Sequence, residues 1–310
     1  MNILITGATG YVGRRVVKQL IENDKNISIL TINRDINKAQ SILPFSNCKH
    51  VSVNDMENEV LLFNPNVCIH LATLSTSRND DEIINPMIEA NITFGVKLLA
   101  ALFKADSLQL FINTGSFAEY RNGVENGFND AYLYTATKSA YRHFVDYYSQ
   151  LKGFKYINAV PFTIYGGDDT AKKLMDYMME SINAKEPVKM SPGNQILDFV
   201  HVDDVVRFYV SAVNSINNIS LLPNGSNYYL GTGIGTRVKD LATLIESKIH
   251  KRLNIFWGGL NYRPLDVMCA VAPTEDNNQV IPWKTQISLD QGIDKLIKKY
   301  DIPKIRKQSQ

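Results

Sequence analysis

The first thirteen residues constrain the fold more than any other part of the chain. Three glycines recur at every third position in the run Gly7-Ala8-Thr9-Gly10-Tyr11-Val12-Gly13. The run follows the apolar segment Ile3-Leu4-Ile5 and precedes a segment with helical spacing, so we expect a strand, a tight turn and a helix N-terminus. Backbone N–H groups and the positive end of a helix dipole at such a turn can hold a pyrophosphate. The pattern therefore predicts a dinucleotide site.

A second motif, Tyr134-Thr135-Ala136-Thr137-Lys138, lies near the middle of the chain. Its Tyr and Lys are four residues apart, which places them on one face of a helix. An unperturbed Tyr titrates near ~10 and is a poor base at neutral pH, but a neighbouring ammonium lowers the pKa of the phenol. We interpret the two side chains as a proton-transfer pair. With the dinucleotide site, this pair predicts nicotinamide-dependent redox chemistry at a carbonyl or carbinol carbon.

Short β-branched segments alternate with helical segments through the first half of the chain. We expect strands at residues 2–6, 27–32, 50–53, 67–71, 108–113 and 155–161. We expect helices at residues 11–23, 57–63, 81–104 and 133–152. This alternation predicts an α/β fold with a Rossmann-type doubly wound parallel sheet, covered by helices on both faces. Such sheets bind ligands at the carboxyl ends of their strands.

The alternation changes after about residue 165. Helical segments are expected at residues 171–183, 203–217, 236–249 and 288–299. We therefore divide the chain into a dinucleotide-binding domain, residues 1–165, and a smaller C-terminal substrate-binding lobe, residues 166–310, with some segments returning to the main sheet. A second glycine cluster, Gly231-Thr232-Gly233-Ile234-Gly235, is interpreted as a structural turn, with Thr236 as a helix N-cap.

The composition is that of an ordinary soluble globular protein, with 45% apolar and 21% charged residues. A net charge of +2 gives no sign of a nucleic-acid partner. The three cysteines, Cys48, Cys68 and Cys269, lack metal-ligand spacing, so we predict no metal site and interpret Cys68 as a buried thiol. A strand begins directly after Met1 and no apolar run reaches ~18 residues. We therefore expect a cytoplasmic protein with no signal peptide and no membrane partner.

Further motifs, in the same order along the chain, resemble the extended short-chain dehydrogenase/reductase family, which contains nucleotide-sugar epimerases, dehydratases and reductases. Besides the glycines and the Tyr-Lys pair, the matching segments are His70-Leu71-Ala72, Asn91, Tyr165-Gly166, residues 198–205 and Arg263-Pro264-Leu265-Asp266. The resemblance covers nearly the whole chain. It implies a nicotinamide-dependent enzyme with a nucleotide-sugar substrate, and a homodimer formed through the helices that flank the Tyr-Lys motif.

The resemblance also implies a catalytic set. A Ser or Thr four residues before a Tyr completes it in the family, and Ser116 precedes Tyr120 by four, with Thr114 as the alternative. Tyr134 is then the acid in reduction or the base in oxidation, Lys138 stabilises the phenolate, and Ser116 hydrogen-bonds the same substrate oxygen.

The motifs and the resemblance together indicate two sets of binding residues. The cofactor set is Gly7, Thr9, Gly10, Tyr11, Val12, Gly13, Asn33, Arg34, Asp55, Met56, Leu71, Ala72, Thr73, Asn91, Tyr134, Lys138, Pro161 and Phe162. The substrate set is Ser75, Ser116, Thr163 and Arg263.

The choice of cofactor depends on the end of the second strand. An acidic residue there accepts the ribose hydroxyls of NAD, whereas a basic residue accommodates the 2′-phosphate of NADP. Asn33 or Arg34 falls at this position, and a guanidinium can bind a phosphate bidentately. We favour NADP over NAD, although Asp35 would take the acidic role if the register were shifted by one or two residues. Asp55-Met56 resembles the adenine-contacting pair of the family.

Two reactions of the family lack their residues. Its dehydratases carry Asp-Glu directly after the catalytic Ser or Thr, whereas Phe117-Ala118 follow Ser116 here. Its 3,5-epimerase/reductases add a Cys and a His, and we expect none of the three cysteines at a strand end beside the active site. We therefore discount both reactions.

Reduction and epimerisation at C4 remain. Arg34 and the segments at residues 111–117 and 195–200, which look most like those of nucleotide-sugar 4-ketoreductases, favour reduction of the C4 ketone of a 4-keto-6-deoxy or dideoxy sugar nucleotide in surface-polysaccharide precursor synthesis. A C4-epimerase with tightly bound NAD is the first alternative. A reductase of small non-sugar carbonyls and an NADP-binding redox sensor or scaffold without turnover are the others.

One position departs from the family pattern. Family members usually carry Arg directly before the Asp-Phe that opens residues 198–205, and this chain has Leu197. The usual guanidinium contact to the diphosphate is therefore missing. We expect Arg263, with Lys189 or Lys172, to carry more of the phosphate binding.

Overall fold

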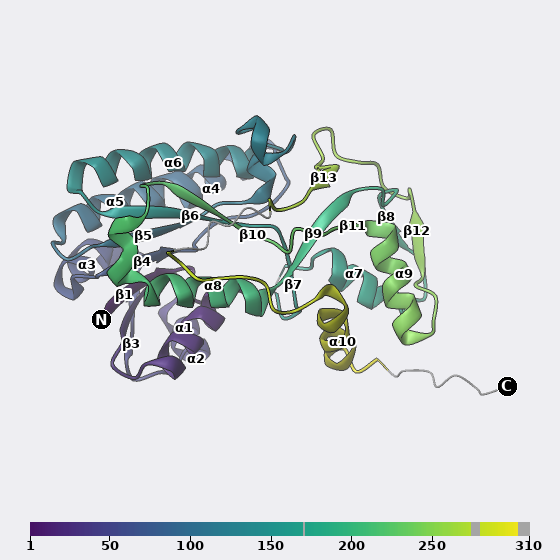
Figure 1. The fold of residues 1–310 in the computed structure, drawn as a ribbon, viewed down its shortest axis with the longest axis horizontal. Helices are drawn as coiled ribbons and strands as arrows, with labels where there is room; N and C mark the ends of the chain where they lie inside the picture. The colour runs from purple at the N-terminus through teal and green to yellow at the C-terminus, as the bar shows by residue number, and fades with distance from the viewer. Residues whose placement is uncertain (170, 274–279, 303–310) are drawn as a thin grey trace.

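The computed structural model describes residues 1–169, 171–273 and 280–302. Its main sheet has seven parallel strands in the order β10-β6-β5-β4-β1-β2-β3 (Figure 1). The strands are β1 (Asn2–Thr6), β2 (Ser28–Asn33), β3 (Cys48–Ser52), β4 (Val67–His70), β5 (Leu110–Thr114), β6 (Lys155–Pro161) and β10 (Ser226–Leu230). The predicted Rossmann-type parallel sheet is confirmed, and the six strands expected from the first half are all present.

Successive residues of the strands point into two separate cores, one on each face of the sheet. Ile3 and Ile5 of β1 pack in one core, and Leu4 between them packs in the other. Helices α1 (Gly13–Asn23) and α8 (Val202–Asn214) cover the first face. Helices α3 (Met56–Phe63), α5 (Phe94–Lys104) and α6 (Leu133–Lys152) cover the second (Figure 1). Burial on both faces explains why the strands are nearly continuous apolar runs.

The expected helix at residues 81–104 is interrupted by a turn of π-helix. It consists of α4 (Asp81–Ile88), which contains Pro86, then the π-turn Glu89–Thr93, then α5. Among the described residues, this is the one helical segment long and apolar enough to cross a membrane, with a mean hydropathy of 1.3. Leu98, Leu99 and Leu102 on it are fully buried, and the core helix of a soluble protein passes the same test.

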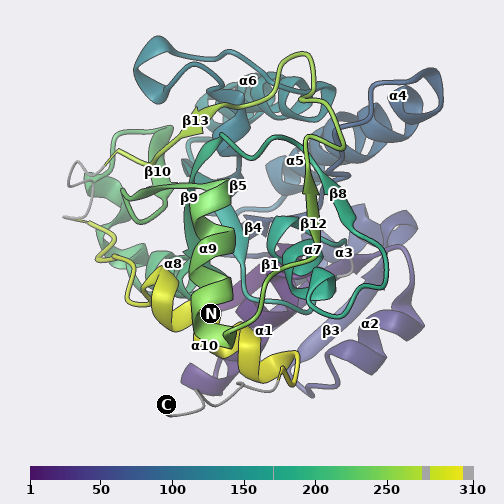
Figure 2. The ribbon, with the colours of Figure 1, turned by 90° about the vertical axis from the view of Figure 1, so that its right-hand side faces the viewer.

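The remaining strands form two small sheets. In the first, β9 (Ile196–His201) pairs with β7 (Thr163–Tyr165), β11 (Gly235–Arg237) and β13 (Cys269–Ala270); in the second, β8 (Val188–Met190) pairs with β12 (Ile255–Trp257). Helices α7 (Leu174–Ser181), α9 (Val238–Ile249) and α10 (Leu289–Lys299) pack around them (Figure 2). All the helical segments expected after residue 165 are present, within a few residues at each end.

Three details differ from the sequence-based expectations or qualify them. Thr236 lies in β11 and Arg237 occupies the N-cap of α9, so the N-cap assignment of Thr236 was wrong. A short helix that was not expected, α2 (Ile36–Ile42), follows β2. Both α8 and β10 follow residue 165 yet pack on or join the main sheet. The domain division at residue 165 stays a prediction.

Candidate active site

The glycine turn brings β1, α1 and the segment after β4 into close contact. Gly7 has φ +67°, and a Cβ on it would lie 2.7 Å from the backbone N of Ala72. A Cβ on Gly13 would lie 2.2 Å from the carbonyl oxygen of Gly7. Both positions therefore require glycine. The turn places the N-terminus of α1 at the carboxyl end of β1. The backbone N–H groups at such a helix N-terminus fit the pyrophosphate of a dinucleotide.

Tyr11 and Val12, within the same turn, lead into α1. The Tyr11 hydroxyl is buried and has no hydrogen-bond partner among the described residues. Its ring lies between two cations, 4.6 Å from the guanidinium carbon of Arg15 and 4.7 Å from Nζ of Lys173. Thr9 and Val12 are partly buried, and Gly10 is exposed.

The segment after β4 is held in place by Asn91. Leu74 donates its backbone N–H to Oδ1 of Asn91 over 2.7 Å, and the Thr73 hydroxyl donates to the same oxygen over 3.1 Å. The amide of Asn91 donates to the Leu74 carbonyl and to the Thr137 hydroxyl. Asn91 is buried and bonded to protein groups on both ends of its amide. Its contribution to a cofactor site therefore comes through the segment that it holds.

Leu71 and Ala72 lie at the start of that segment. The backbone N–H of Leu71 donates to the Thr6 carbonyl oxygen over 3.2 Å. The backbone N–H of Ala72 donates to Oγ1 of Thr6, also over 3.2 Å. Both residues lie against Gly7, and their contact with a cofactor stays a prediction.

The end of β2 distinguishes the three candidates for cofactor choice. The Asn33 amide is buried and donates to the Thr31 carbonyl over 2.9 Å. The Asp35 carboxylate accepts from the backbone N–H of Lys38 and caps α2, so it has a structural role already. Arg34 is exposed and makes no hydrogen bond or ion pair with any described residue. Arg34 is therefore the candidate with a free side chain.

The expected adenine-contacting pair lies at the end of β3. Asp55 is exposed, whereas the Met56 side chain is buried in the core with Leu4 and Leu30. Only the backbone of Met56 is thus left for a contact with the base.

The catalytic pair lies on α6 with the predicted spacing. Lys138 is 3% exposed, and its Nζ lies 6.0 Å from the centroid of the Tyr134 ring. Burial raises the pKa of Tyr134 to about 12, with a further contribution from the charge of Glu119, while the hydroxyls of Ser75 and Thr73 act in the opposite direction. Burial lowers the pKa of Lys138 to about 8.

The expected lowering of the phenol's pKa by Lys138 was therefore wrong for the protein alone. Removal from water disfavours phenolate and ammonium alike, and it is the largest influence on both pKa values. Tyr134 is accordingly protonated at neutral pH and suited to donate a proton. The Lys138 ammonium has no hydrogen-bond acceptor among the described residues, which fits the hydroxyls of a nicotinamide ribose.

Ser116 and Thr114 differ in what they contact. The Thr114 hydroxyl lies 2.8 Å from the Tyr209 hydroxyl of α8 and is bonded there. Ser116 follows β5 and caps the short 3-10 helix Phe117–Glu119, accepting from the backbone N–H of Ala118 over 3.3 Å. Because Thr114 is engaged elsewhere, Ser116 remains the candidate. In the described part of the chain, Ser116 and Tyr134 are not hydrogen-bonded to each other.

Beyond Ser116 lies a cavity of about 510 Å³, which loop residues 120–125 also line. Phe117 and Phe162 form part of its wall and stack with their ring centroids 5.7 Å apart. Phe162 follows Pro161 at the end of β6, and the buried Thr163 hydroxyl next to it has no partner among the residues described. Cys269, at the start of β13, also lines this cavity, and the expectation that no cysteine occupies a strand end beside the active site stays a prediction. The wall combines this aromatic pair with the polar and charged side chains of Arg121, Asn122, Glu125 and Asp266.

Arg263 lies three residues before Asp266, which lines this cavity. Its guanidinium carbon is 5.7 Å from the ring centroid of Tyr132, whose hydroxyl donates to Asp266 over 2.9 Å. Arg263 is exposed and has no ion pair within the described ranges. Lys172, by contrast, is paired with Glu180 at 2.9 Å. Arg263 is the better candidate for an anionic ligand.

The motif at residues 198–205 organises the second glycine cluster. The buried Asp198 carboxylate accepts backbone N–H bonds from Thr232, Gly233 and Ala272 over 2.8–3.2 Å. A Cβ on Gly231 would lie 2.5 Å from Oδ2 of Asp198. The cluster is thus a turn built around a carboxylate, in agreement with the structural interpretation. Leu197 packs against the apolar wall at Phe162.

Sequence reasoning missed one pair of charged residues near the site. Glu119, in the turn after Ser116, forms a buried ion pair with Arg142 of α6. The available signal was a Glu in a turn that is otherwise apolar and an Arg four residues after Lys138. No group of three His, Cys, Asp or Glu with metal-binding geometry occurs in the described residues.

Comparison with known proteins gives consistent results. Residues 3–223 match the profile of the NAD dependent epimerase/dehydratase family. CDP-abequose synthase of Salmonella typhimurium is 27% identical over 307 residues, which cover 96% of this chain and 97% of that protein. A putative UDP-glucose 4-epimerase of Methanocaldococcus jannaschii is 24% identical over 314 residues, covering 95% and 97%.

The solved structures agree on the fold. UDP-glucuronic acid 4-epimerase of Bacillus cereus, in complex with UDP-glucuronic acid and NAD, superposes with a TM-score of 0.84 at 20% identity. The superposition covers 97% of this chain and 98% of that one.

Proposed function

Because the chain belongs to the NAD dependent epimerase/dehydratase family, we propose that it reduces the C4 ketone of a 4-keto-6-deoxy or dideoxy sugar nucleotide with NADPH. At the coarser level, the matches to CDP-abequose synthase and to 4-epimerases support a nicotinamide-dependent enzyme that modifies nucleotide sugars. The finer assignment rests on the site residues.

The observation that carries the proposal is the position of Tyr134 and Lys138, one turn apart on α6, with Nζ of Lys138 6.0 Å from the centroid of the Tyr134 ring. In reduction, a bound nicotinamide supplies the hydride, and the nascent alkoxide at C4 needs a proton. A phenol whose pKa burial raises to about 12 is protonated at neutral pH and donates that proton from α6. In this proposal Ser116 donates a hydrogen bond to the same oxygen, and the Lys138 ammonium stabilises the phenolate that results.

The cavity beside Ser116 supports a deoxygenated sugar. Phe117 and Phe162 stack along its wall, and Ala270 is part of the same lining. A sugar hydroxyl buried against this aromatic part of the wall would lack a partner there, whereas a methyl or methylene group gains from burial. Glu119, the carboxylate nearest to Ser116 in sequence, is bonded to Arg142, which supports discounting dehydration.

Arg34 supports NADPH as the reductant. It follows β2 with an unengaged guanidinium, while Asp35 caps α2. NAD remains the alternative, since the 4-epimerase of Bacillus cereus is solved with NAD. The same similarity keeps a C4-epimerase with tightly bound NAD as the second candidate function. The sensor or scaffold reading is weaker, because both Tyr134 and Lys138 are present.

The test is a pair of incubations. The first contains the protein, a 4-keto-6-deoxy sugar nucleotide and NADPH, and the second contains UDP-glucose without added cofactor. We expect turnover in the first alone, with one NADPH consumed per product. Turnover in the second alone would establish the epimerase instead. NADPH binding without turnover of either nucleotide sugar or of small carbonyls would favour the sensor.

A further inference from the structure

The ion pair between Glu119 and Arg142 is the most deeply buried charge pair near the site. Their side chains are 0% and 8% exposed. Arg142 donates from Nε to Oε1 of Glu119 over 3.1 Å and from Nη2 to Oε2 over 2.7 Å. Oε2 also accepts the backbone N–H of Ser116 over 2.9 Å. One carboxylate therefore connects the Ser116 turn to α6.

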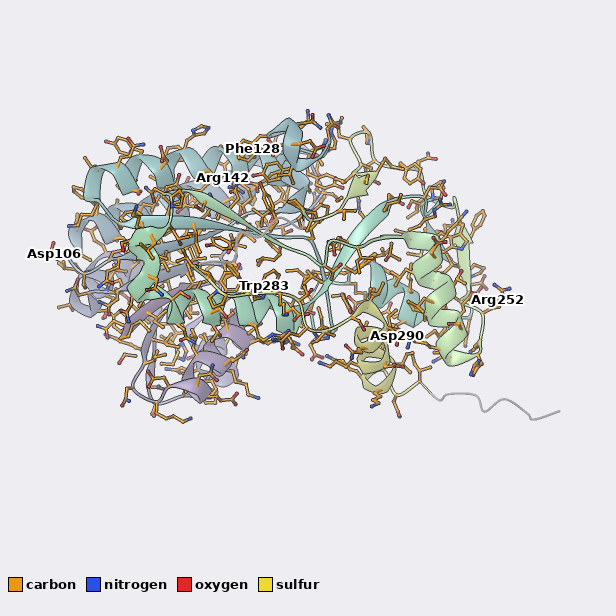
Figure 3. All side chains as sticks on the ribbon, in the orientation of Figure 1. Asp106, Phe128, Arg142, Arg252, Trp283 and Asp290 are labelled. Atoms are coloured by element: carbon orange, nitrogen blue, oxygen red, sulfur yellow. The ribbon has the colours of Figure 1, made fainter. Side chains whose placement is uncertain are left out.

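Arg142 reaches two further segments. Its Nη1 donates to Oδ1 of Asn227 in β10 over 2.7 Å. Its guanidinium carbon lies 5.2 Å from the ring centroid of Phe128, and Figure 3 labels both residues. It also lies 6.0 Å from the ring centroid of Tyr120, which lines the cavity. A Cβ on Gly115 would lie 2.5 Å from Nη2 of Arg142 and 2.5 Å from Oε2 of Glu119. The turn therefore lies so close to the ion pair that a larger residue than glycine would not fit.

The same ion pair lies next to the catalytic lysine. Lys138 precedes Arg142 by one turn on the same face of α6, and both are buried. The charge of Glu119 raises the pKa of Lys138 and that of Arg142 lowers it, against the larger effect of burial. The other titratable neighbours are His70, whose pKa burial lowers to about 3, the phenols Tyr134 and Tyr209, and the Asp130 carboxyl, whose pKa burial raises and which accepts a hydrogen bond from Ser139.

We propose that Glu119 and Arg142 are positioning residues, which dock the Ser116 turn onto α6 and let two adjacent buried cations, Arg142 and Lys138, both stay charged. The inference rests on the proposed roles of Ser116, Tyr134 and Lys138. Without the Glu119 carboxylate, the Arg142 guanidinium and the Lys138 ammonium would lie one helical turn apart and lack the counter-ion that Glu119 supplies. Lys138 would then lose its proton rather than Arg142, because a lysine ammonium deprotonates more readily than a guanidinium.

The experiment follows the titration of Lys138 by NMR of protein labelled with ¹³C at lysine Cε, with Lys138→Met assigning the resonance. Glu119→Gln should move the Lys138 midpoint down by about one pH unit or more, and Arg142→Met should move it up. The double variant Glu119→Gln/Arg142→Met should return it toward the wild-type value. Lys152→Met, which removes an exposed ion pair on the same helix, is the matched control and should not move it.

Opposite shifts in the two single variants support the proposal. Equal shifts in one direction, or no shift in either variant, would overturn it. Residues that act only through packing would not move the Lys138 midpoint in opposite directions. This readout needs no substrate, so it stands even if the proposed reaction is wrong.

Arg142→Lys keeps the positive charge but cannot donate the two parallel hydrogen bonds to Glu119. This variant tests the proposal if Glu119→Gln does not fold. We expect an unchanged Lys138 midpoint with a lower kcat and little change in KM, because only the docking of Ser116 is weakened. An unaltered kcat in this variant would overturn the docking role.

Discussion

Asn91 donates a hydrogen bond from Nδ2 to the Thr137 hydroxyl over 2.9 Å, and Thr137 in turn donates to the backbone carbonyl of Tyr134. This connects the π-turn after α4 with the helix that carries the catalytic pair. The other end of the Asn91 amide holds Thr73 and Leu74. One buried amide thus sets the distance between the segment after β4 and Tyr134.

The first prediction follows from this connection. Asn91→Ala removes hydrogen bonds from buried partners and should lower the free energy of unfolding by about 1–3 kcal/mol in urea denaturation. Turnover should fall as well, since Thr73 and Ser75 are then free to move away from Tyr134. Asn85→Ala, at an exposed position of α4, is the control and should change neither quantity. A fully stable and active Asn91→Ala protein would show that the connection has no role.

The second prediction concerns the cofactor. Isothermal titration should show tighter binding of NADPH than of NADH. Arg34→Ala should remove most of this preference, since a charge-assisted hydrogen bond is worth about 1.5–3 kcal/mol. Lys38→Ala, an exposed cation on the neighbouring helix α2, should leave the preference intact. Equal affinities in the unmodified protein would contradict the assignment and strengthen the case for NAD.

The third prediction concerns proton transfer. Tyr134→Phe removes only the acidic hydroxyl, so cofactor binding should persist while kcat falls by about 10²–10⁴. Ser116→Ala should lose less, because it removes one hydrogen bond to the developing alkoxide. Tyr177→Phe, at an exposed position on α7, is the matched control. Near-normal turnover in Tyr134→Phe would refute the assigned role.

The fourth prediction is a pH dependence of stability. Burial lowers the pKa of Lys138 from 10.5 to about 8. Between these values the unfolded chain keeps a proton that the folded chain has released, so the free energy of unfolding rises with pH. Below pH 8 the cost of burying the ammonium is fully present.

The measurement compares urea denaturation of the wild type and Lys138→Met. From about pH 7 to about pH 9.5, the wild type should gain about 1–2 kcal/mol relative to the variant. Parallel curves for the two proteins would mean that Lys138 titrates as an exposed lysine does.

The fifth prediction concerns assembly. Large apolar side chains are exposed on the helices around the Tyr-Lys motif: Ile84, Ile88, Phe103, Phe144, Tyr147 and Leu151. We expect a homodimer through this face, because burying such a surface is favourable. Analytical ultracentrifugation should show a dimer, and Leu151→Glu should shift it toward monomer. Leu221→Glu, on an exposed apolar residue outside these helices, should not. A monomeric wild type would contradict the prediction.

Local patterns allowed much of this to be predicted. The apolar runs of the first six strands are buried on both faces, and runs of this kind between helical segments indicate a parallel sheet. Other features depended on neighbours distant in sequence. The strand β10 joins the main sheet by pairing with β6. Cys269 reaches the cavity only because β13 pairs with β9.

The sequence by itself determined the glycine turn and the spacing of Tyr134 and Lys138, because both depend on contacts within a few residues along one backbone. The direction of the pKa shifts was decided only by the tertiary structure, since it depends on how much water the packed chain removes from each group. The same holds for Glu119 and Arg142, which are 23 positions apart. Nothing in the sequence indicates that two charged residues so far apart form a pair. They become a buried ion pair only when the Ser116 turn packs against α6.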